Sequence, residues 1–186
     1  MRYLIVCGGK IDKEFGLNEI KTDGIDAIIA ADSGMDFLYE NGVTPDIIVG
    51  DFDSTTTNAL EYFERKGQTE IRRLNPIKDD TDTEYAIRLA IREGARSIVM
   101  LGATGSRIDH VLGNISLLGI GLESGTDISI IDTNNRIRMA DKPVTIEKSA
   151  QYGRFVSLIA VTDDNEVSLR GFKYPVTDYS FDRFTS

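Results

Sequence analysis

Two alternating patterns of apolar and polar residues run through the first two-thirds of the chain. Short runs rich in β-branched residues predict buried strands, and the glycine-ended stretches between them have the periodicity of amphipathic helices. Strands joined by helices predict a parallel sheet covered on both faces, and therefore an α/β, Rossmann-like fold. The predicted strands are Tyr3–Cys7, Ala27–Ala31, Asp46–Val49, Glu70–Arg73, Ser97–Leu101 and Ile128–Ile131.

The ends of the predicted helices carry their own signals. Gly42, Gly67 and Gly94 each follow a helical stretch and can adopt the left-handed conformation that closes a helix. Thr81, with Glu84 three residues later, forms the sequence of a capping box. These signals predict helices at Gly34–Asn41, Thr57–Lys66, Asp82–Glu93 and about Ile108–Leu118.

The pattern changes after Asn134. From there the chain alternates in the manner of β-strands, with turn signals near residues 141–143, 151–153 and 163–165. We therefore expect two domains: an α/β domain at 1–133 and a smaller all-β domain at 134–186.

Composition narrows the possible partners and location. A net charge of −9 argues against nucleic acid, whose binding depends on neutralising phosphates, and would suit a cationic ligand. The simpler interpretation is that the acidity keeps the protein in solution. The single cysteine, Cys7, rules out an internal disulfide and fits a reducing cytoplasm. The sequence has neither a run of apolar residues long enough for a membrane span nor the cleavage site of a signal peptide.

Unusual polar residues gather where the predicted strands end. In an open parallel sheet, ligands bind outside the carboxyl ends of the strands, so these residues are expected at one edge. The second strand runs into Asp32 and Ser33, and the third into Asp51 and Asp53. The segment "NPIKDDTD" follows the fourth strand and contributes three more aspartates, Asp79, Asp80 and Asp82.

Carboxylates crowded at one edge repel each other, and a divalent cation would remove that repulsion. Oxygen ligands without a histidine or cysteine cluster favour Mg²⁺ over zinc. Each aspartate alone is more simply explained as a helix cap or a turn residue. The set at one edge favours a metal site.

The segment "GATGSRIDH" follows the fifth strand and has the features of an anion-binding loop. Gly102 and Gly105 allow the backbone to approach an anion closely, and Arg107 can bind phosphate oxygens. The simpler interpretation is a strand-to-helix turn with a surface arginine. The only histidine, His110, is expected to be structural. The chain has neither a P-loop nor a dinucleotide fingerprint.

Taken in order, these motifs resemble bacterial thiamine pyrophosphokinase. The resemblance rests on "ADSG" (31–34), "GDFDS" (50–54), "DDTD" (79–82), "GATGSRIDHVLGN" (102–114) and "GFKYPVTD" (171–178). Ser33 stands where the family usually has glycine. The family continues beyond the last motif into a further strand, whereas this chain ends at Ser186, so we expect a shortened C-terminal domain.

The resemblance implies an activity and a set of site residues. It implies Mg²⁺-dependent transfer of pyrophosphate from ATP to the hydroxyl of thiamine, in a cytoplasmic homodimer with a C-terminal β-sandwich that binds thiamine. It also implies metal and phosphate ligands at Asp51, Asp53, Asp79 and Asp82. The remaining implied ATP-site residues are Asp32, Ser33, Thr81, Thr104, Gly105, Ser106, Arg107, Asp109 and Asn114.

Two other functions fit part of the pattern. "DFDST" resembles the Asp-x-Asp-x-Thr signature of haloacid-dehalogenase phosphatases, with Asp51 as nucleophile. That signature normally follows the first strand, and here it follows the third. The second alternative is a non-enzymatic module that binds nucleotide or thiamine.

Overall fold

The protein is described from a computed structural model, which defines residues 1–52, 58–75, 80–105 and 107–185. Of the predicted site residues, Asp53, Asp79 and Ser106 lie outside these ranges. The chain divides into two compact units, Met1–Tyr152 and Gly153–Ser186. The domain division predicted between residues 133 and 134 stays a prediction.

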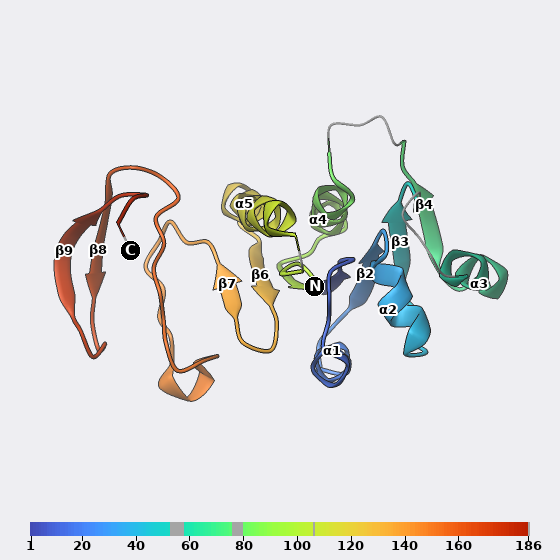
Figure 1. Ribbon diagram of the computed structural model, residues 1–186, viewed down its shortest axis with the longest axis horizontal. Coiled ribbons are helices and arrows are strands. Elements are labelled where there is room, and N and C mark those ends of the chain that lie inside the picture. Colours follow the sequence, from blue (N-terminus) through green and yellow to red (C-terminus); the bar gives the residue numbers. More distant parts are fainter. Residues whose placement is uncertain (53–57, 76–79, 106, 186) are drawn as a thin grey trace. The chain divides into compact units, whose positions relative to one another are not determined.

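The first unit is built around one seven-stranded sheet (Figure 1). Six strands run parallel, and the last pairs antiparallel with the sixth. The spatial order is β4-β3-β2-β1-β5-β6-β7. The strands are β1 (Arg2–Val6), β2 (Ala27–Ala31), β3 (Ile47–Gly50), β4 (Glu70–Arg73), β5 (Ser97–Leu101), β6 (Asp127–Ile131) and β7 (Arg136–Arg138). The predicted α/β class is therefore confirmed.

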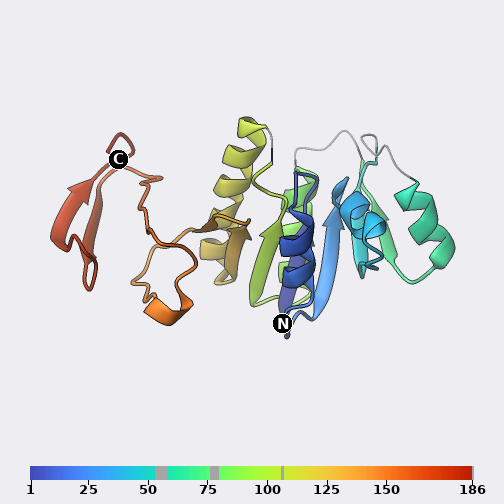
Figure 2. The same cartoon turned by 60° about the horizontal axis from the view of Figure 1, so that its bottom comes forward.

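Helices cover both faces of this sheet (Figure 2). The helices are α1 (Lys13–Ile20), α2 (Gly34–Glu40), α3 (Ala59–Lys66), α4 (Asp82–Arg92) and α5 (Ile108–Ser124). Side chains alternate along β1, so that Tyr3 and Ile5 pack in the cluster that contains α4 and α5. Leu4 and Val6 pack in the opposite cluster with α2 and α3. Burial on both faces explains why the central strands β1, β2, β3 and β5 are visible in the sequence as continuous apolar runs.

The sequence patterns did not predict α1, and they predicted an α5 that was too short. The stretch of α1 contains Gly16, a poor helix former, and its apolar face is weak. A Cβ at Gly16 would lie 2.7 Å from the ring of Phe37, so the glycine allows close helix packing. Asp12 caps α1 by accepting a hydrogen bond from the Phe15 N–H at 2.9 Å, a signal that the sequence carried. The helix α5 continues to Ser124 and closes at Gly125 in the left-handed conformation.

The second unit contains a separate two-stranded antiparallel sheet. Its strands are β8 (Asn165–Leu169) and β9 (Val176–Phe181), with an irregularity in register between Val167 and Leu169. This small sheet agrees with the predicted all-β C-terminal part. Among the described residues, no helix is long and apolar enough to cross a membrane.

Gly34→Ala is expected to lower the free energy of unfolding by about 2–4 kcal/mol, because a Cβ there would lie 1.9 Å from the Val6 carbonyl oxygen. Gly113→Ala is the matched control, since no atom lies within 4 Å of a Cβ at this position in α5. Better helix propensity should make the control more stable by about 0.5–1 kcal/mol. Urea unfolding measures both, and equal effects would contradict the packing described.

Candidate active site

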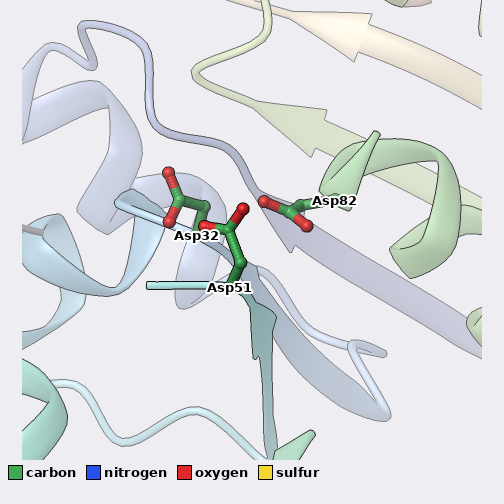
Figure 3. A group of neighbouring side chains, drawn as sticks. All are labelled: Asp32, Asp51 and Asp82. Atoms are coloured by element: carbon green, nitrogen blue, oxygen red, sulfur yellow. The ribbon is translucent and has the colours of Figure 1, made fainter. Parts of the chain in front are cut away.

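Three aspartates converge beyond the carboxyl ends of the central strands. Asp32 follows β2, Asp51 follows β3, and Asp82 is the first residue of α4. Each contributes a carboxylate oxygen to a group whose members lie within 4.8 Å of one another (Figure 3). Sequence positions fifty residues apart therefore form one half-buried acidic centre.

The backbone at the ends of β2 and β3 brings two of these carboxylates together. The Asp32 N–H donates to the Val49 carbonyl oxygen at 2.7 Å, which continues the pairing of the strands. Asp32 then turns in the left-handed region, with φ of 48°. A Cβ at Gly50 would lie 3.1 Å from the Cα of Asp32, so glycine keeps this approach open. Phe52, also left-handed with φ of 64°, turns the chain after Asp51 and is buried.

The third carboxylate is positioned by the start of α4. Thr81 accepts a hydrogen bond from the Glu84 N–H at 3.1 Å, which forms one half of the predicted capping box. The Glu84 carboxylate pairs instead with Arg88 at 2.7 Å. The hydroxyl of Thr83 donates to the sulfur of Cys7 at 3.8 Å and links α4 to the end of β1. Asp82 is thus held on a capped helix that is anchored to the sheet.

Cys7 has no role in chemistry under this geometry. It is buried below the edge of the sheet, and burial raises the pKa of its thiol to about 12, with the Thr83 hydrogen bond acting in the opposite direction. The thiol is therefore neutral at physiological pH and packs as a small apolar side chain.

Glycines pack the loops after β1 and β5 against each other. A Cβ at Gly9 would lie 2.2 Å from the Gly102 carbonyl oxygen, and one at Gly105 would lie 2.8 Å from the Cα of Gly9. The Gly9 N–H donates to that same Gly102 oxygen at 3.0 Å. On the other side, a Cβ at Gly8 would lie 2.0 Å from the hydroxyl oxygen of Ser33. Gly8 therefore leaves the space that the side chain of Ser33 occupies.

The loop after β5 is also supported by α5. The Asn114 side-chain amide donates to the Ala103 carbonyl oxygen at 2.9 Å. At the start of α5, Arg107 and Asp109 form an ion pair at 2.6 Å in which both side chains are about two-thirds exposed. The Arg107 hydrogen bond lowers the pKa of the Asp109 carboxyl. His110 is exposed, and its backbone N–H donates to Asp109 at 3.0 Å.

A pocket of about 470 Å³ lies beside this loop. Its lining includes Thr104 and Gly105, which sequence analysis had selected. It also includes residues outside the predicted site, among them Lys10 after β1 and Asp132 after β6. Both residues follow parallel strands, so the rule that selected the aspartates would have selected them as well.

The acidic centre fits a hard divalent cation. At an effective dielectric constant of 20, two like charges 4.8 Å apart repel by on the order of 3 kcal/mol. Three carboxylates in this space are therefore costly without a compensating charge. Oxygen donors on separate rigid elements, together with water, are the ligands on which Mg²⁺ is usually bound. Asp32 thus joins the predicted ligands Asp51 and Asp82 as a candidate.

The sequence matches known families over most of its length. Residues 21–130 match the family model "Thiamin pyrophosphokinase, catalytic domain", and residues 143–186 match "Thiamin pyrophosphokinase, vitamin B1 binding domain". The chain belongs to the thiamin pyrophosphokinase family. The catalytic-domain match contains Asp32, Asp51 and Asp82, so the acidic centre lies within the family's enzymatic part.

Relatives within the thiamin pyrophosphokinase family support this assignment. The thiamine pyrophosphokinase of Bacillus subtilis (strain 168) is 36% identical over 152 residues, which are 81% of this chain and 70% of the relative. A crystal structure of the Bacillus subtilis enzyme superposes with a TM-score of 0.85 at 31% identity, covering 100% of this chain and 86% of the other. For the Geobacillus thermodenitrificans enzyme the TM-score is 0.78 at 27% identity, with 99% and 84% covered.

Proposed function

We propose that the protein transfers the terminal pyrophosphate of ATP to the hydroxyl of thiamine in a Mg²⁺-dependent reaction, giving thiamine diphosphate and AMP. The observation that carries this proposal is the convergence of Asp32, Asp51 and Asp82. The family assignment supports the type of transfer. Both family matches describe thiamin pyrophosphokinase domains, so we prefer this reaction to the phosphatase and to the non-enzymatic module.

Asp32, Asp51 and Asp82 would hold the Mg²⁺. A bound Mg²⁺ ion would neutralise charge on the phosphates of the donor. The contribution of the chain is to keep the three carboxylates close on two strand ends and a capped helix, so that these ligands are already gathered before the metal–nucleotide complex binds. We retain Asp53 and Asp79 as further candidate ligands on the family pattern.

The proposed reaction forms one bond and breaks one. The hydroxyl oxygen of thiamine bonds to the β-phosphorus of ATP, and the bond from that phosphorus to the oxygen bridging to the α-phosphorus breaks. AMP leaves with the electron pair, and the hydroxyl proton is released. Such transfers depend mainly on positioning and charge neutralisation, which suits a site built of carboxylates and glycine loops.

Arg107 is the proposed cation for the phosphates. Its guanidinium is paired with Asp109 in an exposed position, so a phosphate would have to replace that carboxylate. Thr104 and Gly105 lie in the adjacent loop, which Asn114 supports from α5. Ser106 is kept as a phosphate contact on the family pattern. Asp32 and Ser33 would face the nucleotide from the end of β2.

Thiamine recognition and assembly are further parts of the proposal. The match of residues 143–186 to a vitamin B1 binding domain supports thiamine binding by the C-terminal region. We propose a homodimer, supported by the apolar side chains that this region exposes, including Phe155, Ile159 and Phe184. We also propose a cytoplasmic location, because the chain has a single cysteine and so no internal disulfide.

The reaction is tested by its products. Purified protein with Mg²⁺, ATP and thiamine should form AMP and thiamine diphosphate in equal amounts, measured by chromatography. Omission of thiamine should suppress AMP formation. Formation of ADP in place of AMP would contradict pyrophosphate transfer, and a phosphoaspartate trapped on Asp51 would favour the phosphatase.

A further inference from the structure

Two arginines end the edge strand β4, and their side chains point to opposite faces of the sheet. Arg72 pairs with Glu70 of the same strand at 2.6 Å and with Glu93 at the end of α4 at 3.6 Å. Arg73 pairs instead with Glu64 of α3. Charged side chains protect an edge strand against pairing with another chain, and this role explains Arg72. Arg73 makes a further contact that edge protection does not require.

The further contact is with the ring of Phe52. The Arg73 guanidinium lies 5.3 Å from the centre of this ring, within the range of a cation–π interaction. Arg73 is also the register partner of Gly50, and the Leu74 N–H donates to the Gly50 carbonyl oxygen at 2.9 Å. The pairing of β3 with β4 therefore places this guanidinium beside the two residues that follow β3, which are Asp51 and Phe52.

The ring of Phe52 folds back over the end of its own strand. A Cβ at Gly50 would lie 3.1 Å from this ring and 3.1 Å from the Cα of Asp32, so the end of β3 is close to both. Phe52 also belongs to the apolar cluster that contains Phe63 of α3, and it is buried. The ring is therefore held against the end of β3 within that cluster.

The backbone of Phe52 has a conformation that a bulky residue rarely adopts. Its φ of 64° lies in the left-handed region, where the Cβ comes too close to the following carbonyl oxygen. Such a conformation persists only where the surrounding contacts enforce it, and it is found mostly at functional sites. Here the contacts are made by the ring, and the enforced turn comes directly after Asp51. Loss of a contact on the ring would allow the turn to relax and the Asp51 carboxylate to move.

We infer that Arg73 is a positioning residue for Asp51. Through the ring of Phe52 it holds the left-handed turn, and the turn keeps the Asp51 carboxylate within the acidic centre. Glu64 holds the guanidinium from the side of α3. The inference rests on the proposed function, because the position of Asp51 serves to bind Mg²⁺.

Charge and position predict opposite effects when Arg73 is neutralised. A cation near the acidic centre repels Mg²⁺, so electrostatics alone predicts that Arg73→Met binds the ion more tightly. A positioning role predicts weaker binding, because Asp51 is no longer held beside Asp32 and Asp82. The direction of the change therefore separates the two roles.

Urea unfolding with increasing Mg²⁺, and without nucleotide, measures the dissociation constant of the ion. Arg73→Met should raise this constant at least about threefold, a change of the size expected for loss of a cation–π contact. Arg73→Lys keeps a cation and should recover part of the affinity. Arg92→Met is the matched control, because the Arg92 guanidinium lies 5.5 Å from the centre of the Tyr85 ring, at the opposite end of α4 from Asp82. The control should leave the dissociation constant unchanged.

A second substitution tests whether Arg73 acts through the ring. Phe52→Leu keeps an apolar side chain but removes the aromatic face, and it should also weaken Mg²⁺ binding. The double variant of Arg73→Met and Phe52→Leu should then bind Mg²⁺ no more weakly than Phe52→Leu alone, because both substitutions remove the same contact. Additive losses would mean that Arg73 acts by another route, and the inference would fail.

Steady-state kinetics distinguish positioning from a direct phosphate contact. With a positioning role, Arg73→Met should lower kcat at limiting Mg²⁺ and recover as Mg²⁺ is raised, while the KM for thiamine stays within about twofold. A higher KM for ATP, together with an unchanged affinity for Mg²⁺ in the absence of nucleotide, would make Arg73 a phosphate ligand and overturn the inference.

The outcomes separate this inference from the proposed reaction. If thiamine diphosphate forms but Arg73→Met binds Mg²⁺ as Arg92→Met does, the reaction stands and the positioning role fails. If Mg²⁺ binding depends on Arg73 as described but no thiamine diphosphate forms, the positioning role stands and the reaction fails. A parent protein that Mg²⁺ does not stabilise would remove the metal site, and the inference with it.

Discussion

Asp82→Asn is expected to lower kcat/KM for thiamine diphosphate formation by about 10²–10³-fold. The substitution keeps the size of the side chain and its position at the first residue of α4, but it removes one charge from the acidic centre. Only interactions that are stronger in the transition state raise kcat, and charge builds up between the phosphates as the bond breaks. The loss should therefore affect kcat as well as the KM for the metal–nucleotide complex. Initial rates of AMP formation at saturating Mg²⁺ measure it.

Asp23→Asn is the control for this prediction. Asp23 is an exposed aspartate before β2, at the edge of the sheet opposite to the acidic centre. Loss of its charge changes the net charge by the same amount, and activity should stay within about twofold, as expected for surface substitutions. A rate for Asp82→Asn close to that of Asp23→Asn would remove Asp82 from the catalytic centre. Circular dichroism should show that both variants keep the helical content of the parent.

Much of the fold could be predicted because parallel strands buried on two faces carry a strong local signal. Ala27–Ala31 and Ser97–Leu101 were predicted with the bounds that the structure gives them. The signal failed where tertiary contacts replaced local preference. Gly16 weakens the helical pattern of α1. A glycine is needed there because the ring of Phe37, which is distant in sequence, packs against this position. The strand β7 has three residues and no periodicity that could be recognised.

The candidate site, like the fold, was predicted only in part. The rule of the carboxyl ends selected Asp32, Asp51 and Asp82 because the position of a strand end is a local property. It could not say that Asp32 would come within the same 4.8 Å as the other two, because that depends on Gly50 and on the left-handed turn at Asp32. The pocket depends on strand order, which follows from pairing between distant segments. The rule could have named Lys10 and Asp132 one at a time, since each follows a parallel strand, but it could not show that the two line one pocket.

Asp51→Asn is expected to change stability in opposite directions with and without Mg²⁺. In metal-free buffer the variant should be more stable than the parent by about 1–3 kcal/mol, because two repulsive carboxylate pairs are removed from the acidic centre. In the parent, Mg²⁺ at one hundred times its dissociation constant should add about 2.7 kcal/mol, since the ion binds the folded state alone. The variant should gain much less, so the order of stabilities reverses as Mg²⁺ is added.

Urea unfolding of both proteins, with chelator and with increasing Mg²⁺, measures this reversal without any substrate. The result is therefore independent of whether thiamine is the acceptor. Asp23→Asn should follow the parent at every Mg²⁺ concentration, which separates a specific ion from the general screening of a negatively charged protein. Parallel stability curves for the parent and Asp51→Asn would mean that the three carboxylates meet for another reason, and the proposed metal site would then fail. A reversal would identify the Asp51 carboxylate both as a source of the instability and as a ligand of the ion that removes it.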